Sequence, residues 1–212
     1  MRNIILFGPA GAGKTTVANM IIGVLRDKSE ETRVIKVSQG NKIKVICNDL
    51  KYNNKKEKRE LQQAVGQEMR RIFGNDVWCE VTKKEIVQVK NMLGLGMAED
   101  RAMFVIDDGR QHNEYDFWTK ERFLAVGVIA DLETRAKRLL ERDGYDQKGN
   151  LRFENEITAD DIAREKCQYL IRNEGTMEDL RELVVELMDM ISENMVTERT
   201  GDAERVKAPW EK

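Results

Sequence analysis

The sequence predicts an α/β protein built on a doubly wound parallel sheet of about five strands, with helical insertions. Three observations lead to this fold class. Short apolar segments alternate with helical patterns, the apolar segments have continuous apolar or β-branched cores, and a glycine-rich segment joins the first strand to the first helix. Continuously apolar strands are typical of a parallel sheet that is covered by helices on both faces. Such sheets bind ligands at the carboxyl ends of their strands.

The expected elements follow one another in regular order, as right-handed crossovers require. The strand candidates are residues 3–7, 33–38, 102–107, 124–130 and 168–172, and the helical patterns lie at 14–26, 58–73, 77–92, 132–142 and 177–193. Two capping patterns, Thr158 to Asp161 and Thr176 to Asp179, place a hydroxyl three residues before an acid. Each is therefore expected to begin a helix.

The glycine-rich segment, residues 8–15 (GPAGAGKT), matches G-x-x-x-x-G-K-[ST] and is flanked by a strand and a helix. Its glycines allow backbone N–H groups to converge on phosphate oxygens, Lys14 can reach the β- and γ-phosphates, and the Thr15 hydroxyl can ligate Mg²⁺. The alternative is a glycine-rich turn with no role in phosphate binding, but such a turn would not require a strand directly before it and a helix directly after it. The segment therefore predicts binding of ATP with Mg²⁺. The expected nucleotide-binding residues here are Gly8, Ala10, Gly11, Ala12, Gly13, Lys14, Thr15 and Thr16, with Thr15 as the metal ligand.

Composition limits the other possibilities. The chain has 212 residues, of which 35% are charged, and a net charge of −2, so mixed-sign helix surfaces are expected rather than a nucleic-acid-binding face. Three cysteines far apart suggest neither a disulfide framework nor a metal site. No apolar run approaches membrane-spanning length, and the first strand leaves no room for a signal peptide, so a cytoplasmic location without a membrane partner is expected.

Two insertions interrupt the regular order. We expect a domain over 1–193, in which 39–101 is a helical acceptor-binding insertion and 143–161 is a polar lid that is mobile without ligand. A lid would exclude water from a transferring phosphoryl group. The remaining segment, 194–212, is expected to be a loosely held polar tail.

Charged residues follow the third strand. Asp107 and Asp108 stand at its carboxyl end, and Arg110 could bind a phosphate through two N–H groups. A solvated Asp-Gly turn is the alternative, but the position after a core strand favours function. If the acceptor were a hydroxyl, Asp107 or Asp108 would take its proton, and the sequence leaves that choice open.

Three arginines share one face of the helix at 132–142, because Arg135, Arg138 and Arg142 recur at three and four residues. We expect Arg138 and Arg142 to contact phosphate, since a multiply charged transition state needs several cations. Arg135 is expected on a solvated, salt-bridged surface. His112, the sole histidine, receives no role.

Four segments together resemble the phage-type deoxynucleoside monophosphate kinases: 8–15, 59–66 (RELQQAVG), 108–114 (DGRQHNE) and 170–177 (LIRNEGTM). Residues 131–143 are also similar to dephospho-coenzyme A kinase and phosphomevalonate kinase. All of these belong to the nucleoside monophosphate kinase-like P-loop proteins. The resemblance implies transfer of the γ-phosphoryl group of ATP to the phosphate of a small acceptor, a (deoxy)nucleoside monophosphate.

The resemblance also implies roles for residues. It places lid contacts at Arg138 and Arg142 and an adenine-side loop around Asn173 to Gly175, with Lys14, Arg138, Arg142 and Asp108 as the catalytic set. The implied acceptor-binding residues are Lys44, Arg70, Asp108, Arg110 and Glu114, although the segment 40–44 lacks the proline that the family often has there. The assembly is left open between a monomer and a homodimer.

Other functions remain open, one of them a different kind of kinase and two from other classes of nucleotide-binding protein. A kinase could act on a hydroxyl or a non-nucleotide acceptor. A GTPase-like regulatory module would need Asn-Lys-x-Asp, and the nearest match, 54–57, comes too early and ends in glutamate. An ATPase motor would need an acidic pair after four apolar residues, which 104–108 offers in part.

Overall fold

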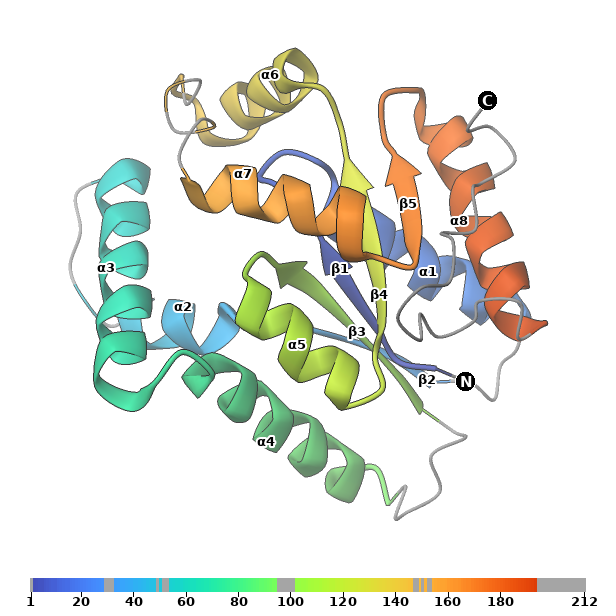
Figure 1. Ribbon diagram of the computed structural model, residues 1–212, viewed down its shortest axis with the longest axis horizontal. Coiled ribbons are helices and arrows are strands. Elements are labelled where there is room, and N and C mark those ends of the chain that lie inside the picture. The colour runs from blue at the N-terminus through green and yellow to red at the C-terminus, as the bar shows by residue number, and fades with distance from the viewer. Residues whose placement is uncertain are drawn as a thin grey trace.

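A single parallel sheet organises the molecule (Figure 1). The computed structural model describes residues 2–28, 33–48, 50, 54–94, 102–146, 149, 151 and 154–193. The strands are β1 (Ile4–Phe7), β2 (Arg33–Val37), β3 (Ala102–Gly109), β4 (Leu124–Ile129) and β5 (Tyr169–Arg172), and their order across the sheet is β2-β3-β1-β4-β5. All four strand pairings are parallel, so the predicted fold class is confirmed.

Helices cover both faces of this sheet. They are α1 (Lys14–Lys28), α2 (Asn41–Asn48), α3 (Lys55–Phe73), α4 (Val77–Met92), α5 (His112–Lys120), α6 (Leu132–Asp143), α7 (Glu154–Asp161) and α8 (Met177–Ser192), with a π-helical turn, η3 (Ile162–Lys166), directly after α7. The predicted capping box begins α8. There the Thr176 hydroxyl accepts the Asp179 N–H, and the Asp179 carboxylate accepts the Thr176 N–H.

The core explains why the central strands β1 and β4 are apolar throughout. Ile4 and Leu6 face a cluster completed by α1 and α8, whereas Ile5 and Phe7 face a cluster completed by α4, α5 and η3. All four side chains are fully buried. Since successive residues of a strand point to opposite faces, a sheet covered on both sides needs apolar residues at every position.

The helical insertion and the lid region depart from expectation in detail. Between β2 and β3 the chain forms α2, α3 and α4, of which the helical patterns at 58–73 and 77–92 predicted the last two; α2 and α5 were not predicted. The prediction that Thr158 begins a helix is wrong: Thr158 lies inside α7, whose first turn already carries Glu154 and Glu156. Acidic residues suit the positive end of a helix dipole. The expected tail, 194–212, lies outside the described residues.

No helix in the described part of the chain is both long enough and apolar enough to cross a membrane.

The close contact between β4 and η3 generates a stability prediction. A Cβ on Gly127 would lie 2.3 Å from the Ala163 carbonyl oxygen, so Gly127→Ala forces the backbone of η3 away from the sheet. We expect a loss of about 1–3 kcal/mol in the free energy of unfolding, measured by urea denaturation.

Gly23→Ala in α1 is the matched control, because a Cβ there meets nothing within 4 Å. Alanine in a helix interior is favoured over glycine by about 0.5–1 kcal/mol, so this variant should be more stable than the wild type. Equal effects of the two substitutions would contradict the packing at Gly127.

Candidate functional site

The phosphate loop, residues 8–15, leaves β1 at the centre of the sheet and packs closely against the ends of neighbouring strands. Gly8 has φ +150°, and a Cβ there would lie 2.0 Å from the carbonyl oxygen of Val128. Gly13 has φ +100°, and its Cβ would lie 2.2 Å from Nδ2 of Asn173. Side chains at these two positions would therefore push the loop off β4 and β5.

Lys14, the first residue of α1, is buried beneath the loop, with 7% of its surface exposed. Its ammonium donates to the carbonyl oxygen of Gly8 and, at 3.1 Å, to that of Pro9. Burial, reinforced by the charge of Arg110, lowers the pKa of Lys14 to about 7. A phosphate anion in the loop would favour the charged ammonium.

Asp107 lies beside Thr15, whose side chain hydrogen-bonds the carboxylate. Burial, followed by repulsion from Asp108, raises the pKa of Asp107. A hydroxyl and a carboxylate next to a phosphate-binding loop are the oxygen ligands that Mg²⁺ takes in proteins. The chemistry of these two residues therefore fits the expected metal, and the sequence did not distinguish Asp107 from Asp108 for such a role.

Asp108 has a different environment. Its Oδ1 accepts the N–H of Gln39 at 2.9 Å, and its Oδ2 accepts the Ser38 hydroxyl at 2.7 Å and the N–H of Gly40 at 2.8 Å. The carboxylate at the end of β3 thus fixes the turn that follows β2. These three hydrogen bonds hold the Asp108 carboxylate in one orientation.

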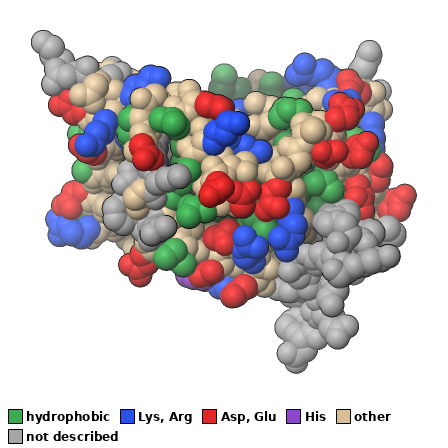
Figure 2. Space-filling model, turned by 90° about the horizontal axis from the view of Figure 1, so that it is seen from above, with side chains coloured by type: hydrophobic (Ala, Val, Ile, Leu, Met, Phe, Trp, Pro, Cys, Tyr) green, Lys and Arg blue, Asp and Glu red, His purple; other side chains and the backbone are tan. Residues whose placement is uncertain are grey.

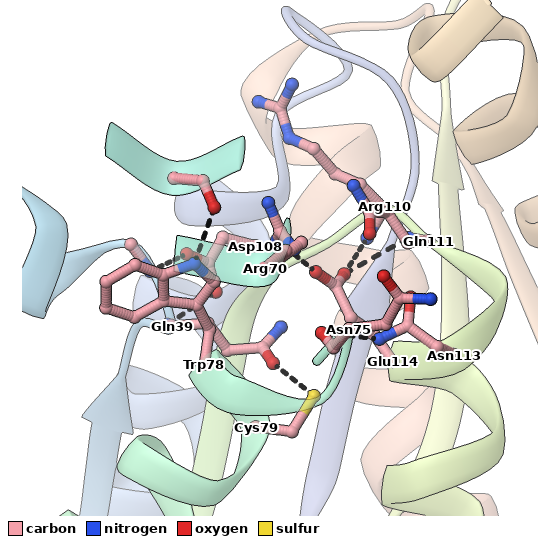
Figure 3. A network of polar contacts seen from close by, with 12 residues as sticks. Gln39, Arg70, Asn75, Trp78, Cys79, Asp108, Arg110, Gln111, Asn113 and Glu114 are labelled. Carbon is pink, nitrogen blue, oxygen red and sulfur yellow. Dashed lines mark hydrogen bonds and ion pairs between the residues drawn. The ribbon is translucent and has the colours of Figure 1, made fainter. Parts of the chain in front are cut away.

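Gln39 is a buried residue of the site that the sequence analysis missed. Only 3% of its surface is exposed, and its amide oxygen accepts the indole N–H of Trp118 at 3.0 Å and the Cys79 thiol at 3.1 Å. Figure 3 shows this residue between Asp108 and helix α4, with Glu114 nearby. The sequence offers one signal for Gln39: this polar residue directly follows the predicted strand 33–38, at the edge of the sheet where ligands bind.

Glu114 contacts both Arg70, through the guanidinium, and Arg110, through the backbone N–H. Its carboxylate accepts Nη2 of Arg70 at 3.1 Å and the backbone N–H groups of Arg110 and Gln111 at 2.7 and 3.1 Å, which closes a capping box at the start of α5 (Figure 3). Burial raises the pKa of Glu114, and the Arg110 N–H and the Arg70 guanidinium oppose that shift. The carboxylate holds the Arg70 guanidinium in one orientation.

The Arg110 side chain extends from this point toward the phosphate loop and meets a residue that the sequence did not single out. Its Nη1 lies 2.8 Å from Oε1 of Glu156, while Oε2 of Glu156 accepts the N–H of Ala10 at 2.5 Å. Burial opposes ionisation of Glu156, but Arg110 and the Ala10 N–H hold its pKa below the usual range. No local pattern marks Glu156, because its partners lie far away in sequence.

One arginine of α6, Arg135, is not placed as expected. Arg135 is only 6% exposed, so its assignment to a solvated face is wrong. The reason is that the first turn of α6 packs on the loop, where a Cβ on Gly11 would meet the Arg135 backbone at 2.8 Å. Burial lowers the pKa of Arg135. Arg142 is exposed and ion-paired with Asp143 at 2.7 Å.

Arg138 reaches the loop through Asn173. The Arg138 Nη2 donates to Oδ1 of Asn173 at 3.3 Å, and Nδ2 of Asn173 donates to the Ala12 carbonyl at 2.9 Å. Asn173 thus positions the phosphate loop from the end of β5. Gly175 lies farther on, where a Cβ would meet Asp179 at the start of α8.

Lys44 is exposed on α2, and its charge opposes the rise in the pKa of Asp107. On the face viewed in Figure 2, acidic and basic side chains are interspersed across the described surface.

Four buried side-chain nitrogens in the described residues have no hydrogen-bond partner, and all four belong to residues of this site: Gln39 Nε2, Arg70 Nε, Arg135 Nε and Arg138 Nη1. Buried donors are normally satisfied, so their concentration here indicates a place for ligand oxygens.

Solved structures with a similar fold include three kinases. A gluconokinase from Sinorhizobium meliloti is 13% identical, with a TM-score of 0.52 and a match over 92% of this chain and 95% of that one. A shikimate kinase from Acinetobacter baumannii in complex with shikimate is 19% identical, with a TM-score of 0.49 over 93% and 96%. The APS kinase of Mycobacterium tuberculosis, in complex with AMPPNP and APS, is 10% identical, with a TM-score of 0.49 over 89% and 98%.

No curated protein matches the sequence significantly. Residues 4–163 match the family described as AAA domain, and this span includes the phosphate loop, Asp107 and the arginines of α6. The five-stranded parallel sheet is the P-loop NTPase fold that occurs in small-molecule kinases. Fold, loop and family match agree, and the chain is a P-loop protein of the AAA domain family.

Proposed function

We propose that this protein transfers the γ-phosphoryl group of ATP to the phosphate of a small acceptor, a (deoxy)nucleoside monophosphate. One observation carries the proposal: two arginines lie near the phosphate loop at the same edge of the sheet, Arg70, whose guanidinium pairs with Glu114, and Arg110, whose guanidinium pairs with Glu156. A donor triphosphate and an anionic acceptor each need a cationic site. The fold similarity to a gluconokinase supports a phosphotransferase, and the sequence resemblance favours a nucleotide acceptor.

The donor side rests on Lys14, Thr15 and Asp107. The Lys14 ammonium would turn from the Gly8 and Pro9 carbonyls to the β- and γ-phosphates of ATP. Thr15 and Asp107 would hold Mg²⁺, which when bound supplies positive charge to the phosphate oxygens. Asn173 keeps the loop in shape by its bond to Ala12. The buried Nη1 of Arg138 has no hydrogen-bond partner among the described residues and would be available to the transferring group.

The acceptor side rests on Arg70 and Arg110. The Arg70 Nε is buried without a partner in the described structure, and Glu114 fixes the guanidinium that carries it. An acceptor phosphate, with a second pKa of about 6, is largely dianionic at neutral pH and needs no general base. Asp108, whose carboxylate already accepts three hydrogen bonds, would serve as a positioning residue. This arrangement favours a phosphate over a hydroxyl acceptor.

We further propose that 39–101 holds the acceptor and that 143–161 covers the site. The two regions already touch, because Nη1 of Arg59 in α3 lies 3.3 Å from Oδ2 of Asp143 at the end of α6. Closure over both ligands would exclude water from the transferring group.

A coupled assay of ADP release tests the function. The acceptors are all nucleoside and deoxynucleoside monophosphates, dephospho-coenzyme A, phosphomevalonate, gluconate and shikimate. We expect rapid ADP release only with a monophosphate. Release at the same rate without any acceptor would indicate a regulatory NTPase or a motor domain, and activity only with gluconate or shikimate would indicate a hydroxyl acceptor.

Lys14→Ala should reduce turnover on the best acceptor by about 10²–10³-fold, because loss of one preorganised electrostatic donor typically has an effect of that size. Steady-state kinetics at saturating ATP measure the effect, with thermal unfolding as the check on folding. Turnover near the wild-type rate would remove Lys14 from the donor site.

Arg70→Ala should raise the KM of the acceptor by about 10- to 100-fold and that of ATP far less, since a hydrogen bond to a charged group contributes about 1.5–3 kcal/mol. The neighbouring Arg71 is the matched control, because it is 70% exposed and pairs only locally with Glu68 in the described structure. Arg71→Ala should leave both KM values unchanged. A selective effect of Arg70→Ala on ATP would move Arg70 to the donor side.

Binding of ATP at pH 8 should be accompanied by proton uptake. With a pKa of about 7, Lys14 is mostly neutral at this pH in the ligand-free protein, and phosphate contact raises that pKa. The protein should therefore take up about one proton per nucleotide bound. Calorimetric titrations in Tris and in HEPES, which differ in ionisation enthalpy, measure the uptake. A binding enthalpy that is the same in both buffers would contradict the proposal.

A further inference from the structure

The side chain of Gln39 joins two helices from inside the core. Its amide oxygen accepts the indole N–H of Trp118 in α5 at 3.0 Å and the thiol of Cys79 in α4 at 3.1 Å, and all three residues are buried. An indole N–H can only donate, so the amide atom that faces it is the oxygen. Figure 3 shows the Gln39 side chain reaching Cys79 from the turn beside Asp108. A single oxygen thus connects α4 and α5.

The backbone of the same residue is tied to the end of β3. The N–H groups of Gln39 and Gly40 and the hydroxyl of Ser38 all donate to the Asp108 carboxylate. The turn between β2 and α2 is therefore fixed on two sides, by Asp108 through its backbone and by α4 and α5 through the Gln39 side chain.

Helix α4 carries this connection to α3. Trp78 directly precedes Cys79 in the first turn of α4, and its indole N–H donates to the carbonyl oxygen of Gly66 at 3.0 Å. Gly66 lies one turn before Arg70 in α3. Residues four apart in a helix lie on the same face, so the contact with Gly66 holds α3 close to the point from which the Arg70 side chain extends.

Helix α5 carries the connection to the Arg70 side chain itself. Glu114 lies one turn before Trp118 on the same face of α5, and its carboxylate pairs with the Arg70 guanidinium at 3.1 Å. The Gln39 oxygen therefore lies behind both helices that place Arg70. One of them holds the backbone of α3, and the other holds the guanidinium.

Packing alone does not require an amide at this position. The Nε2 of Gln39 is buried and has no hydrogen-bond partner among the described residues, and a buried donor without a partner costs free energy. An unbranched methionine side chain would fill similar space without a buried polar group. Departures from the rules of core packing are expected mainly at functional sites. The amide oxygen, which faces α4 and α5, is the atom that such a function would use.

We propose that Gln39 is a positioning residue of the acceptor site, which holds the Asp108 turn and the Arg70 guanidinium in one relative arrangement through α4 and α5. It acts through these residues and not by contact with the acceptor. An acceptor phosphate must meet its binding groups in one geometry, and a displacement of about 1 Å is enough to impair an enzyme strongly. This role rests on the proposed function, which assigns Arg70 and Asp108 to the acceptor.

Steady-state kinetics with the best monophosphate test this role in Gln39→Met, which keeps the length of the side chain and removes its oxygen. The KM of the monophosphate should rise on the order of tenfold, whereas the KM of ATP should change less than about twofold. Trp118→Phe removes the indole N–H that Gln39 accepts and should act in the same direction. The double variant should be no worse than the more affected single one, because the two residues share one contact.

Val184→Ala is the matched control for lost stability. Val184 is fully buried in the cluster on the opposite face of the sheet, with α1 and α8. This variant should lower the midpoint of thermal unfolding and leave both KM values unchanged. If Gln39→Met does not fold, Trp118→Phe takes its place in both experiments.

Hydrogen exchange of backbone amides tests the same connection without any substrate. In Gln39→Met, exchange at 38–44 and 66–73 should be on the order of tenfold faster than in the wild type, and exchange at 177–191 should be unchanged. Val184→Ala should show the reverse pattern.

The outcomes separate this role from the proposed function. Equal rises in the two KM values, or an acceptor KM no higher than that of Val184→Ala, overturn the positioning role even if the wild type phosphorylates a monophosphate. If no monophosphate causes ADP release, the proposed acceptor class fails and hydrogen exchange decides alone. Faster exchange at 38–44 and 66–73 then upholds the connection from Gln39 to Arg70, and exchange at wild-type rates overturns it.

Discussion

The close packing of the phosphate loop against its surroundings is the constraint on which the rest of the site depends. Each of three loop glycines faces a different element: Gly8 lies against β4, Gly11 against the first turn of α6, and Gly13 against Asn173 at the end of β5. These contacts bring α6 and β5 to the loop as well as shaping the loop for phosphate. The position of Arg138, which reaches the loop through Asn173, follows from the same packing.

Charge at the site is balanced in pairs across elements that are distant in sequence. Glu114 of α5 holds Arg70 of α3, and Glu156 of α7 holds Arg110 after β3. Each of these carboxylates also accepts backbone N–H groups, so removal of either would leave both a cation and buried donors unsatisfied. A ligand that displaces one carboxylate must therefore offer its own negative oxygens, as a phosphate does.

Residues 8–15 could be identified from the sequence because the pattern, the strand before it and the helix after it are all local. The central strands β1 and β4 could also be predicted from the sequence, because a strand buried on both faces requires a continuous apolar run. Arg135 was misplaced because helical spacing says which residues share a face and not what that face packs against. Glu156 could not be found at all: its contact with Ala10 spans 146 positions and exists only once α7 has folded onto the loop. Gln39 was partly predictable: its position after a strand, at the edge of the sheet that binds ligands, could have been identified from the sequence, but its contacts with Trp118 and Cys79 could not.

The π-helical turn η3 has a consequence for how this chain could vary in evolution. In η3 the Cys167 N–H bonds to the Ile162 carbonyl, five residues back, so this turn accommodates one residue more than an α-helical turn. Directly afterwards, β5 is held in register by β4. An insertion between the two strands can therefore be absorbed in a widened turn without moving Asn173. Homologues could therefore change the length of the β4–β5 connection while keeping Asn173 and the phosphate loop in place.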